Sequence, residues 1–202
     1  MPRHESPTSR TRPARTPSSP AVELYSPTAR AFHWIVVALL LVQIPLGLYM
    51  VRYGAATNFA APTGQMYDSH KLLGLAILLV VVLRLAYRLA HGAPAHEPTL
   101  ETWHKLASGF NHWGLYLLLL AIPVGGWVAV SMYGPFQPFG IALPSLAAEN
   151  KALAEQVFMV HKFAAWLLIA FVGIHVGAAL YHHLIRGDNV LARMIPGLLR
   201  KH

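Results

Sequence analysis

The sequence predicts an all-α integral membrane protein, a four-helix bundle with both termini on the cytoplasmic side. Hydrophobic residues make up 55% of the 202 residues and charged residues only 12%, whereas soluble domains usually carry about 25% charged residues. The apolar residues also gather into runs of about 20 residues, the length that an α-helix needs to cross a bilayer. Lys and Arg are concentrated in some of the polar segments and not in others, which predicts the orientation.

Four spans are expected within one domain that covers residues 27–200, and they lie at about residues 31–50, 70–89, 112–132 and 161–183. In the loop before the last span, Ser145 is expected to cap a short amphipathic helix over residues 146–158. Residues 1–26 are rich in Pro, Ser, Thr and Arg, so a disordered basic tail is expected there. A signal peptide is the less favoured interpretation of this region, because the following apolar run exceeds the usual length of about 7–15 residues.

Positive charge sets the expected topology. Most basic side chains lie in the N-terminal segment, in the region after the second span and in the C-terminal tail, namely Arg3, Arg10, Arg12, Arg15, Arg30, Arg84, Arg88, Lys105, Arg186, Arg193, Arg200 and Lys201. The other two loops hold little beyond Arg52, Lys71, Lys151 and Lys162. Both termini and the loop at 90–111 should therefore face the cytoplasm. Basic residues beside apolar runs indicate membrane lipid as a partner and exclude a nucleic-acid surface.

Histidines inside the apolar runs are the strongest functional signal, because ionisable residues within a membrane are rare and usually functional. His161 and His175 lie 14 residues apart in the fourth span, so they share a helical face about 21 Å apart along the axis. The topology places His70 at the outer end of the second span and His33 near the inner end of the first. Matching by depth pairs His70 with His161 and His33 with His175. His112, at the start of the third span, is an alternative to His33.

Two facing imidazoles at each of two depths favour two haem groups. Such pairs fill both axial positions of a haem iron, which suits electron transfer. A zinc or copper site would need more ligands at one depth, and no Asp or Glu is placed to supply them. The chain has no Cys, which excludes iron–sulfur clusters and covalently attached haem. The alternative to haem is a proton or ion pathway that is lined by these histidines.

Two further residues are candidates for the inner site. Arg84 follows His70 by 14 residues on the same face, where its guanidinium could hold a haem propionate. The alternative is that Arg84 extends to lipid head groups, as is expected of Arg88. His182, seven residues after His175, could bind a quinone carbonyl or relay a proton, or it could be solvated. The remaining histidines outside the spans are expected to be solvated: His4, His91, His96, His104 and His202.

Several stretches carry a family resemblance: RAFHW at 30–34, LRLAYRL at 83–89, NHWGLYLLLLAIPVGGW at 111–127 and YHHLIRGDNVLARMIPG at 181–197. Through these stretches the chain resembles, over about residues 26–200, the bacterial cytochrome b561 family of small dihaem membrane proteins. The resemblance implies that residues 27–200 form a four-helix cytochrome b domain. It also implies two b haems, whose axial ligands are His33, His70, His161 and His175.

The resemblance further implies a multi-pass protein of the bacterial inner membrane that exchanges electrons with the quinone pool, with ubiquinone as acceptor. Two functions stay open. One is enzymatic, the oxidation of superoxide at the outer face coupled to ubiquinone reduction, in which Arg52, Lys71 and Lys162 attract the anion. The other is a non-catalytic anchor or electron carrier for a soluble or periplasmic redox partner, such as a dehydrogenase or hydrogenase.

Overall fold

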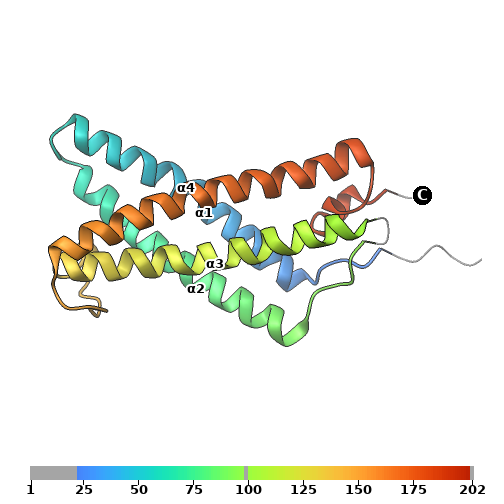
Figure 1. The fold of residues 1–202 in the computed structure, drawn as a ribbon, viewed down its shortest axis with the longest axis horizontal. Helices are drawn as coiled ribbons and strands as arrows, with labels where there is room; N and C mark the ends of the chain where they lie inside the picture. Colours follow the sequence, from blue (N-terminus) through green and yellow to red (C-terminus); the bar gives the residue numbers. More distant parts are fainter. Residues whose placement is uncertain (1–21, 98–99, 201–202) are drawn as a thin grey trace, which may run out of the picture.

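Four long helices form the bundle in the computed structural model, which describes residues 22–97 and 100–200. They are α1 (Pro27–Ala56), α2 (Thr63–His91), α3 (Thr102–Tyr133) and α4 (Lys151–Tyr181) (Figure 1). Each is long and apolar enough to cross a membrane, and the described residues contain no strand. The predicted four-helix membrane bundle is therefore confirmed. Of the predicted tail, residues 1–21 lie outside the described part of the chain.

Each of the four helices begins before its predicted span, because hydropathy marks only the part of a helix that lies in hydrocarbon. The short helices lie in the connecting and terminal segments: η1 (Pro138–Gly140), η2 (His182–Arg186), η3 (Leu191–Arg193) and η4 (Pro196–Leu198). The helix predicted over residues 146–158 begins only at Lys151 and is continuous with α4. Residues 146–150 are not helical, and the Asn150 side chain caps α4 by accepting a hydrogen bond from the Leu153 N–H at 3.1 Å. Asn150 takes the role that was predicted for Ser145, because both residue types cap helices well.

The helices pack as two pairs. α1 packs along α2 and α3 along α4, while α2 also contacts α3. Their buried core comes from all four helices and comprises Val36, Ile77, Val81, Tyr116, Leu118, Leu119 and Leu168. On α4, Leu168 lies seven residues from both His161 and His175. The hydrophobic core therefore separates two levels of histidines.

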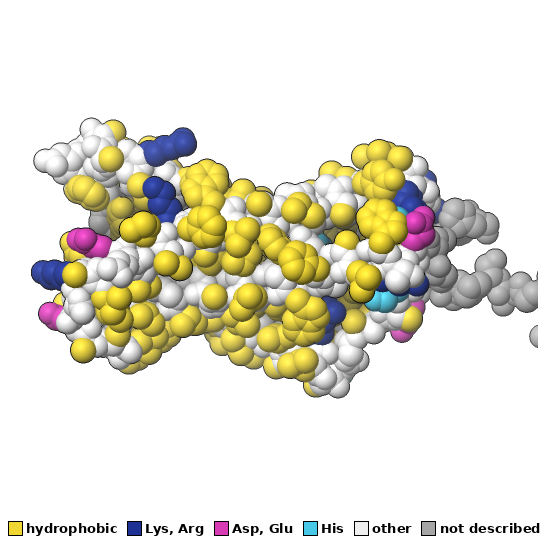
Figure 2. Space-filling model, in the orientation of Figure 1, with side chains coloured by type: hydrophobic (Ala, Val, Ile, Leu, Met, Phe, Trp, Pro, Cys, Tyr) yellow, Lys and Arg dark blue, Asp and Glu magenta, His cyan; other side chains and the backbone are white. Residues whose placement is uncertain are grey.

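The outer surface of the bundle is apolar along its middle. Large side chains that face outward include Leu41, Phe110 and Phe163, which are 71%, 74% and 71% exposed. Figure 2 shows hydrophobic side chains over the middle of the visible face, with charged side chains gathered toward its two ends. An apolar surface of this extent matches a lipid environment rather than water.

The two ends of the bundle differ. The start of α1, the α2–α3 connection and the C-terminal segment meet at one end, which we call the terminal end (Figure 1). The buried Arg193 joins them: its Nε donates to the Glu23 carbonyl at 2.9 Å and its Nη2 to the Ala95 carbonyl at 2.6 Å. We call the opposite end, with the α1–α2 and α3–α4 connections, the loop end.

Candidate functional site

Four histidines inside the bundle lie in two facing pairs. His33 of α1 faces His175 of α4, with ring centroids 6.1 Å apart and ring planes at 65°. His70 of α2 faces His161 of α4, with centroids 6.3 Å apart and planes at 74°. The structure thus brings together the same residues that matching by depth paired. The first pair lies toward the terminal end (the inner pair) and the second toward the loop end (the outer pair).

The spacing within each pair fits a metal ion between the rings. A metal–imidazole bond is about 2 Å long and the nitrogen lies roughly 1 Å from the ring centre, so two rings on one metal have centroids about 6 Å apart. A direct N–H···N hydrogen bond would bring the centroids to about 5 Å. Within the described residues, no group of three or more His, Cys, Asp or Glu could hold a metal ion. The pairs therefore fit a haem with two axial ligands, whose porphyrin fills the other positions.

The outer pair is shaped by one hydrogen bond and two glycines. His161 Nδ1 lies 3.0 Å from the Ile122 carbonyl oxygen and donates to it, so Nε2 carries the free lone pair. Gly47 and Gly126 lie directly against the two rings. A Cβ at Gly47 would come within 2.9 Å of His70 Cε1, and one at Gly126 within 3.1 Å of His161 Cε1. These glycines let α1 and α3 pass close to the histidines.

The inner pair lines a cleft at the terminal end. Besides His33 and His175, the lining includes both Arg84 and Arg88, whose guanidinium carbons lie 5.6 and 5.8 Å from the centre of the Tyr116 ring. Arg88, which was predicted to extend to lipid head groups, thus lies beside Arg84 in the lining of the cleft. Two guanidinium groups beside the histidines suit the two carboxylates that a haem carries.

His112 also touches the inner pair. Its ring centroid lies 5.1 Å from that of His175, and its Nδ1 donates to the Ser108 carbonyl at 2.7 Å. The shorter spacing is that of two imidazoles in direct contact, whereas the spacing of His33 and His175 leaves room for a metal ion. This geometry favours His33 over His112 as the partner of His175.

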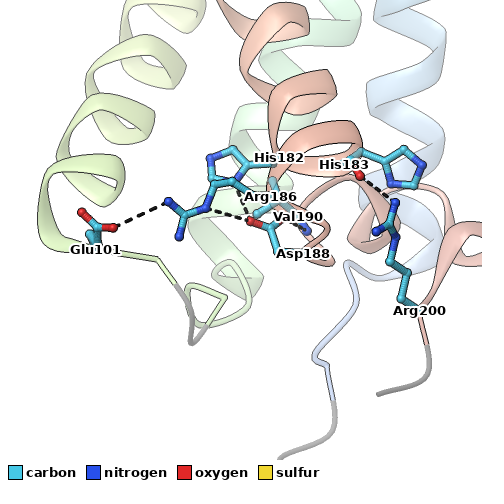
Figure 3. A network of polar contacts seen from close by, with 7 residues as sticks. All are labelled: Glu101, His182, His183, Arg186, Asp188, Val190 and Arg200. Atoms are coloured by element: carbon cyan, nitrogen blue, oxygen red, sulfur yellow. Dashed lines mark hydrogen bonds and ion pairs between the residues drawn. The ribbon is translucent and has the colours of Figure 1, made fainter.

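His182 is buried at the terminal end (Figure 3). Its Nδ1 lies 2.6 Å from Asp188 Oδ2, so the alternative of a solvated His182 is wrong. Two local features produce this contact. α4 ends in the π-helical turn η2, and Gly187 then adopts a left-handed conformation, with φ 69°, which glycine reaches without steric cost. The chain reverses there and brings Asp188 back to His182.

His104 was predicted to be solvated, and this is also wrong. It is 8% exposed, its ring stacks on that of Trp103 at 3.7 Å and lies 5.2 Å from that of His182. Neither of its ring nitrogens has a hydrogen-bond partner among the described residues. The sequence analysis missed His104 because it placed the start of the third span at His112, where the apolar run begins. α3 begins ten residues earlier, at Thr102, so His104 lies within the helix. His91 and His96 are exposed, as expected, and His4 and His202 lie outside the described residues.

Known proteins resemble nearly the whole bundle. The family described as prokaryotic cytochrome b561 matches residues 24–197. "Cytochrome b561 homolog 2" of Escherichia coli (strain K12) is 30% identical over 177 residues, which cover 86% of this chain and 92% of the relative. "Probable superoxide oxidase CybB" of Yersinia pestis is 31% identical over 173 residues, covering 85% and 96%. "Cytochrome b562" of Cereibacter sphaeroides is 30% identical over 164 residues, covering 81% and 89%.

The family match includes all four helices and both histidine pairs. Together with the membrane-spanning fold, it makes this a multi-pass inner-membrane protein that transfers electrons through b-type haem. The chain belongs to the prokaryotic cytochrome b561 family.

Proposed function

We propose that the protein carries electrons across the membrane through two haem b groups, one held by His70 and His161 and the other by His33 and His175. The supporting observation is the spacing of the paired rings, 6.3 and 6.1 Å, which suits an intervening metal ion. Haem supplies an iron that gains and loses one electron. The chain supplies the imidazoles, the apolar core between the two levels, and Arg84 for a propionate.

At the terminal end we place electron exchange with the quinone pool, with ubiquinone as acceptor. His182 supports this placement because it lies seven residues beyond His175 on α4, about 10 Å along the axis. An imidazole at that depth can donate a hydrogen bond to a quinone carbonyl. The buried Asp188 holds its ring in one orientation.

At the loop end we propose superoxide as the electron donor. One relative of similar length is named a probable superoxide oxidase. Arg52 and Lys162 are exposed at this end, whereas Lys71 is paired with Asp68 at 3.0 Å. Cationic side chains near the outer pair would steer an anion toward it, with a rate that falls as the salt concentration rises.

A haem count tests the ligand assignment. We expect the purified protein to show a reduced-minus-oxidised b-type spectrum and two haems per chain by pyridine haemochrome. His161→Ala and His175→Ala should each leave one haem. His91→Ala, which removes an exposed histidine at the end of α2, should leave two. Two haems in either of the first two variants would show that the ligands are assigned wrongly.

Stopped-flow mixing with superoxide tests the donor. We expect haem reduction faster than spontaneous dismutation, and slower reduction at higher ionic strength. If the haem is present but superoxide does not reduce it, the function is instead that of an electron carrier or anchor for another redox protein. Co-purification of that partner would then identify it.

A further inference from the structure

A groove lies between the start of α1 and the C-terminal segment at the terminal end. Pro27, Arg30 and Trp34 of α1 line one side of it, and Met194, Ile195 and Pro196 line the other. The cleft of the inner pair shares only Met194 with this groove. The groove is therefore a separate feature of the surface.

Arg30 is the charged side chain in an otherwise apolar lining. Its Nε is buried and has no hydrogen-bond partner among the described residues, and none of the ion pairs in that part of the chain includes it. Buried donors of charged groups are normally paired, because leaving them unpaired is costly. The groove thus contains a guanidinium whose hydrogen-bonding capacity a ligand can use.

Acidic side chains at the same end are engaged elsewhere. Glu23 Oε2 accepts from the Ala95 N–H at 3.0 Å, and Asp188 Oδ2 accepts from His182 Nδ1 at 2.6 Å. The positive charge of Arg30 is therefore not balanced by these carboxylates. The start of α1 adds to it, because a helix N-terminus carries partial positive charge.

The depth of the groove matches that of lipid head groups. Arg30 precedes His33 by three residues, about 4.5 Å along the axis, and the apolar run of α1 begins directly after it, at Ala31. Trp34 is 42% exposed and lies one turn further along α1. Indole rings favour the boundary between head groups and hydrocarbon. The guanidinium therefore faces the head-group layer and the Trp34 ring faces the upper part of the acyl chains.

Charge also argues against the N-terminal tail of the chain as the occupant of the groove. Residues 1–21 contain four Arg and one Glu, so their net charge has the same sign as that of Arg30. Basic segments beside a membrane attract anionic lipids instead. The complementary occupant is an anion with an apolar part.

We propose that this groove binds one anionic phospholipid, with its phosphate on the Arg30 guanidinium and an acyl chain along Trp34 and Ile195. The planar guanidinium can donate two parallel hydrogen bonds to phosphate oxygens. A zwitterionic lipid carries a compensating ammonium group and binds more weakly. Because the groove joins α1 to the C-terminal segment, the bound lipid ties the two ends of the chain together.

Lipid titration monitored by native mass spectrometry tests the site. Dioleoylphosphatidylglycerol is added to the haem-loaded protein in detergent, and bound lipids are counted. We expect Arg30→Gln to weaken the tightest lipid site by ~10-fold, the scale of a charge-assisted hydrogen bond, and Arg30→Lys to weaken it less. Arg52→Gln is the matched control, because it removes the same exposed charge from the other end of α1 and should bind as the wild-type protein does.

Two further probes identify the ligand in the wild-type protein. We expect dioleoylphosphatidylcholine to bind at least ~10-fold more weakly than the glycerol lipid, since it has no net charge. Inorganic phosphate at the same concentration should not displace the lipid. If phosphate does displace it, the groove is a simple anion site and the lipid proposal is wrong.

Hydrogen exchange tests the tie between the two ends of the chain. The Leu198 N–H donates to the Ile195 carbonyl at 3.0 Å, and the Leu199 N–H donates to the Pro196 carbonyl at 3.2 Å. At about ten times its Kd, phosphatidylglycerol should slow exchange at these two amides by up to ~10-fold in the wild-type protein. In Arg30→Gln the same lipid concentration should have little effect.

Equal affinity of the wild-type protein for the two lipids overturns the proposal, and so does equal phosphatidylglycerol affinity in the wild-type protein and Arg30→Gln. The first comparison needs no variant, so it decides even if Arg30→Gln does not fold. An unchanged haem count in Arg30→Gln shows that the bundle is intact and that a loss of lipid binding comes from the groove.

Discussion

At the scale of single residues, a glycine determines how closely α1 approaches the outer histidine pair. A Cβ on Gly47 would lie 2.9 Å from His70 Cε1, closer than a real Cβ contact, so the His70 ring must move. We expect Gly47→Ala to reduce the haem count from two toward one, as measured by pyridine haemochrome. Gly125→Ala is the matched control, because a Cβ there meets no atom within 4 Å. Equal haem content in the two variants would contradict this role of Gly47.

Arg84 offers a test of charge beside the inner pair, since it lines the same cleft as His33 and His175. We expect Arg84→Gln to lower the midpoint potential of the inner haem, because loss of a nearby positive charge favours the oxidised iron. The interaction is on the order of 1–2 kcal/mol at an effective dielectric constant near 20. Spectroelectrochemical titration measures the shift, and Arg84→Lys should retain most of the wild-type potential. A large loss of haem without a shift would assign Arg84 a structural role.

The residues of the candidate site differ in how far the sequence could predict them. His33, His70, His161 and His175 could be paired because helical rise and the order of the spans determine depth. Whether a side chain points into the bundle or away from it depends on the rotation of its helix about the helix axis. Neither the depth of the residue nor its hydropathy predicts that rotation. Arg88 was for this reason expected at the lipid head groups and lies in the cleft, and His104 and Asp188 were missed as partners of His182.

At the scale of elements, one carboxylate ties α2 to the α3–α4 connection. Asp68 accepts a hydrogen bond from the Phe139 N–H at 3.0 Å and one from Lys71 at 3.0 Å. Hydrogen bonds to charged groups contribute about 1.5–3 kcal/mol. We therefore expect Asp68→Asn to speed hydrogen exchange at the Phe139 amide by roughly ten-fold or more, with the helix amides unchanged. Glu149→Gln, an exposed change in the same connection, should have no effect, and equal exchange in both variants would contradict the tie.

The apolar runs predicted that each helix exists, but they did not predict the residues at which it begins and ends. Hydropathy cannot show the polar turns by which α1 and α3 extend past the expected spans. Between Ser145 and Asn150, two good capping residues, only the packed structure decides which one begins α4. The π-helical turn η2 has no sequence pattern that distinguishes it from a continued α-helix.

At the scale of the whole molecule, the positive-inside pattern predicts that the terminal end faces the cytoplasm. The chain has no Cys, so single cysteines can report orientation without background. Ala93 lies in the α2–α3 connection and Ala148 in the α3–α4 connection, and both are exposed. We expect a membrane-impermeant maleimide to label Ala148→Cys and not Ala93→Cys on spheroplasts, and to label both after lysis. The reverse pattern would place the terminal end outside.

The arrangement of the helices as two pairs was not visible in the sequence. Composition and the length of the apolar runs predicted the number of helices, because both reflect burial in lipid. They carry no information about which helices contact each other. The pairing of α1 with α2 and of α3 with α4 depends on which faces meet, and the apolar faces of these helices are nearly uniform. What the pairing creates is the space across which His33 meets His175 and His70 meets His161.

Under the proposed function, the separation of the two histidine levels on α4 would make electron transfer sensitive to the membrane voltage. His161 and His175 lie 14 residues apart, so an electron passing between their levels crosses about 21 Å of a hydrocarbon core roughly 30 Å thick. A full crossing is worth about 2.3 kcal/mol per 100 mV, so this step is worth about 1.6 kcal/mol per 100 mV. Inward transfer runs against a negative interior, and an energised membrane would slow it while favouring the reverse direction.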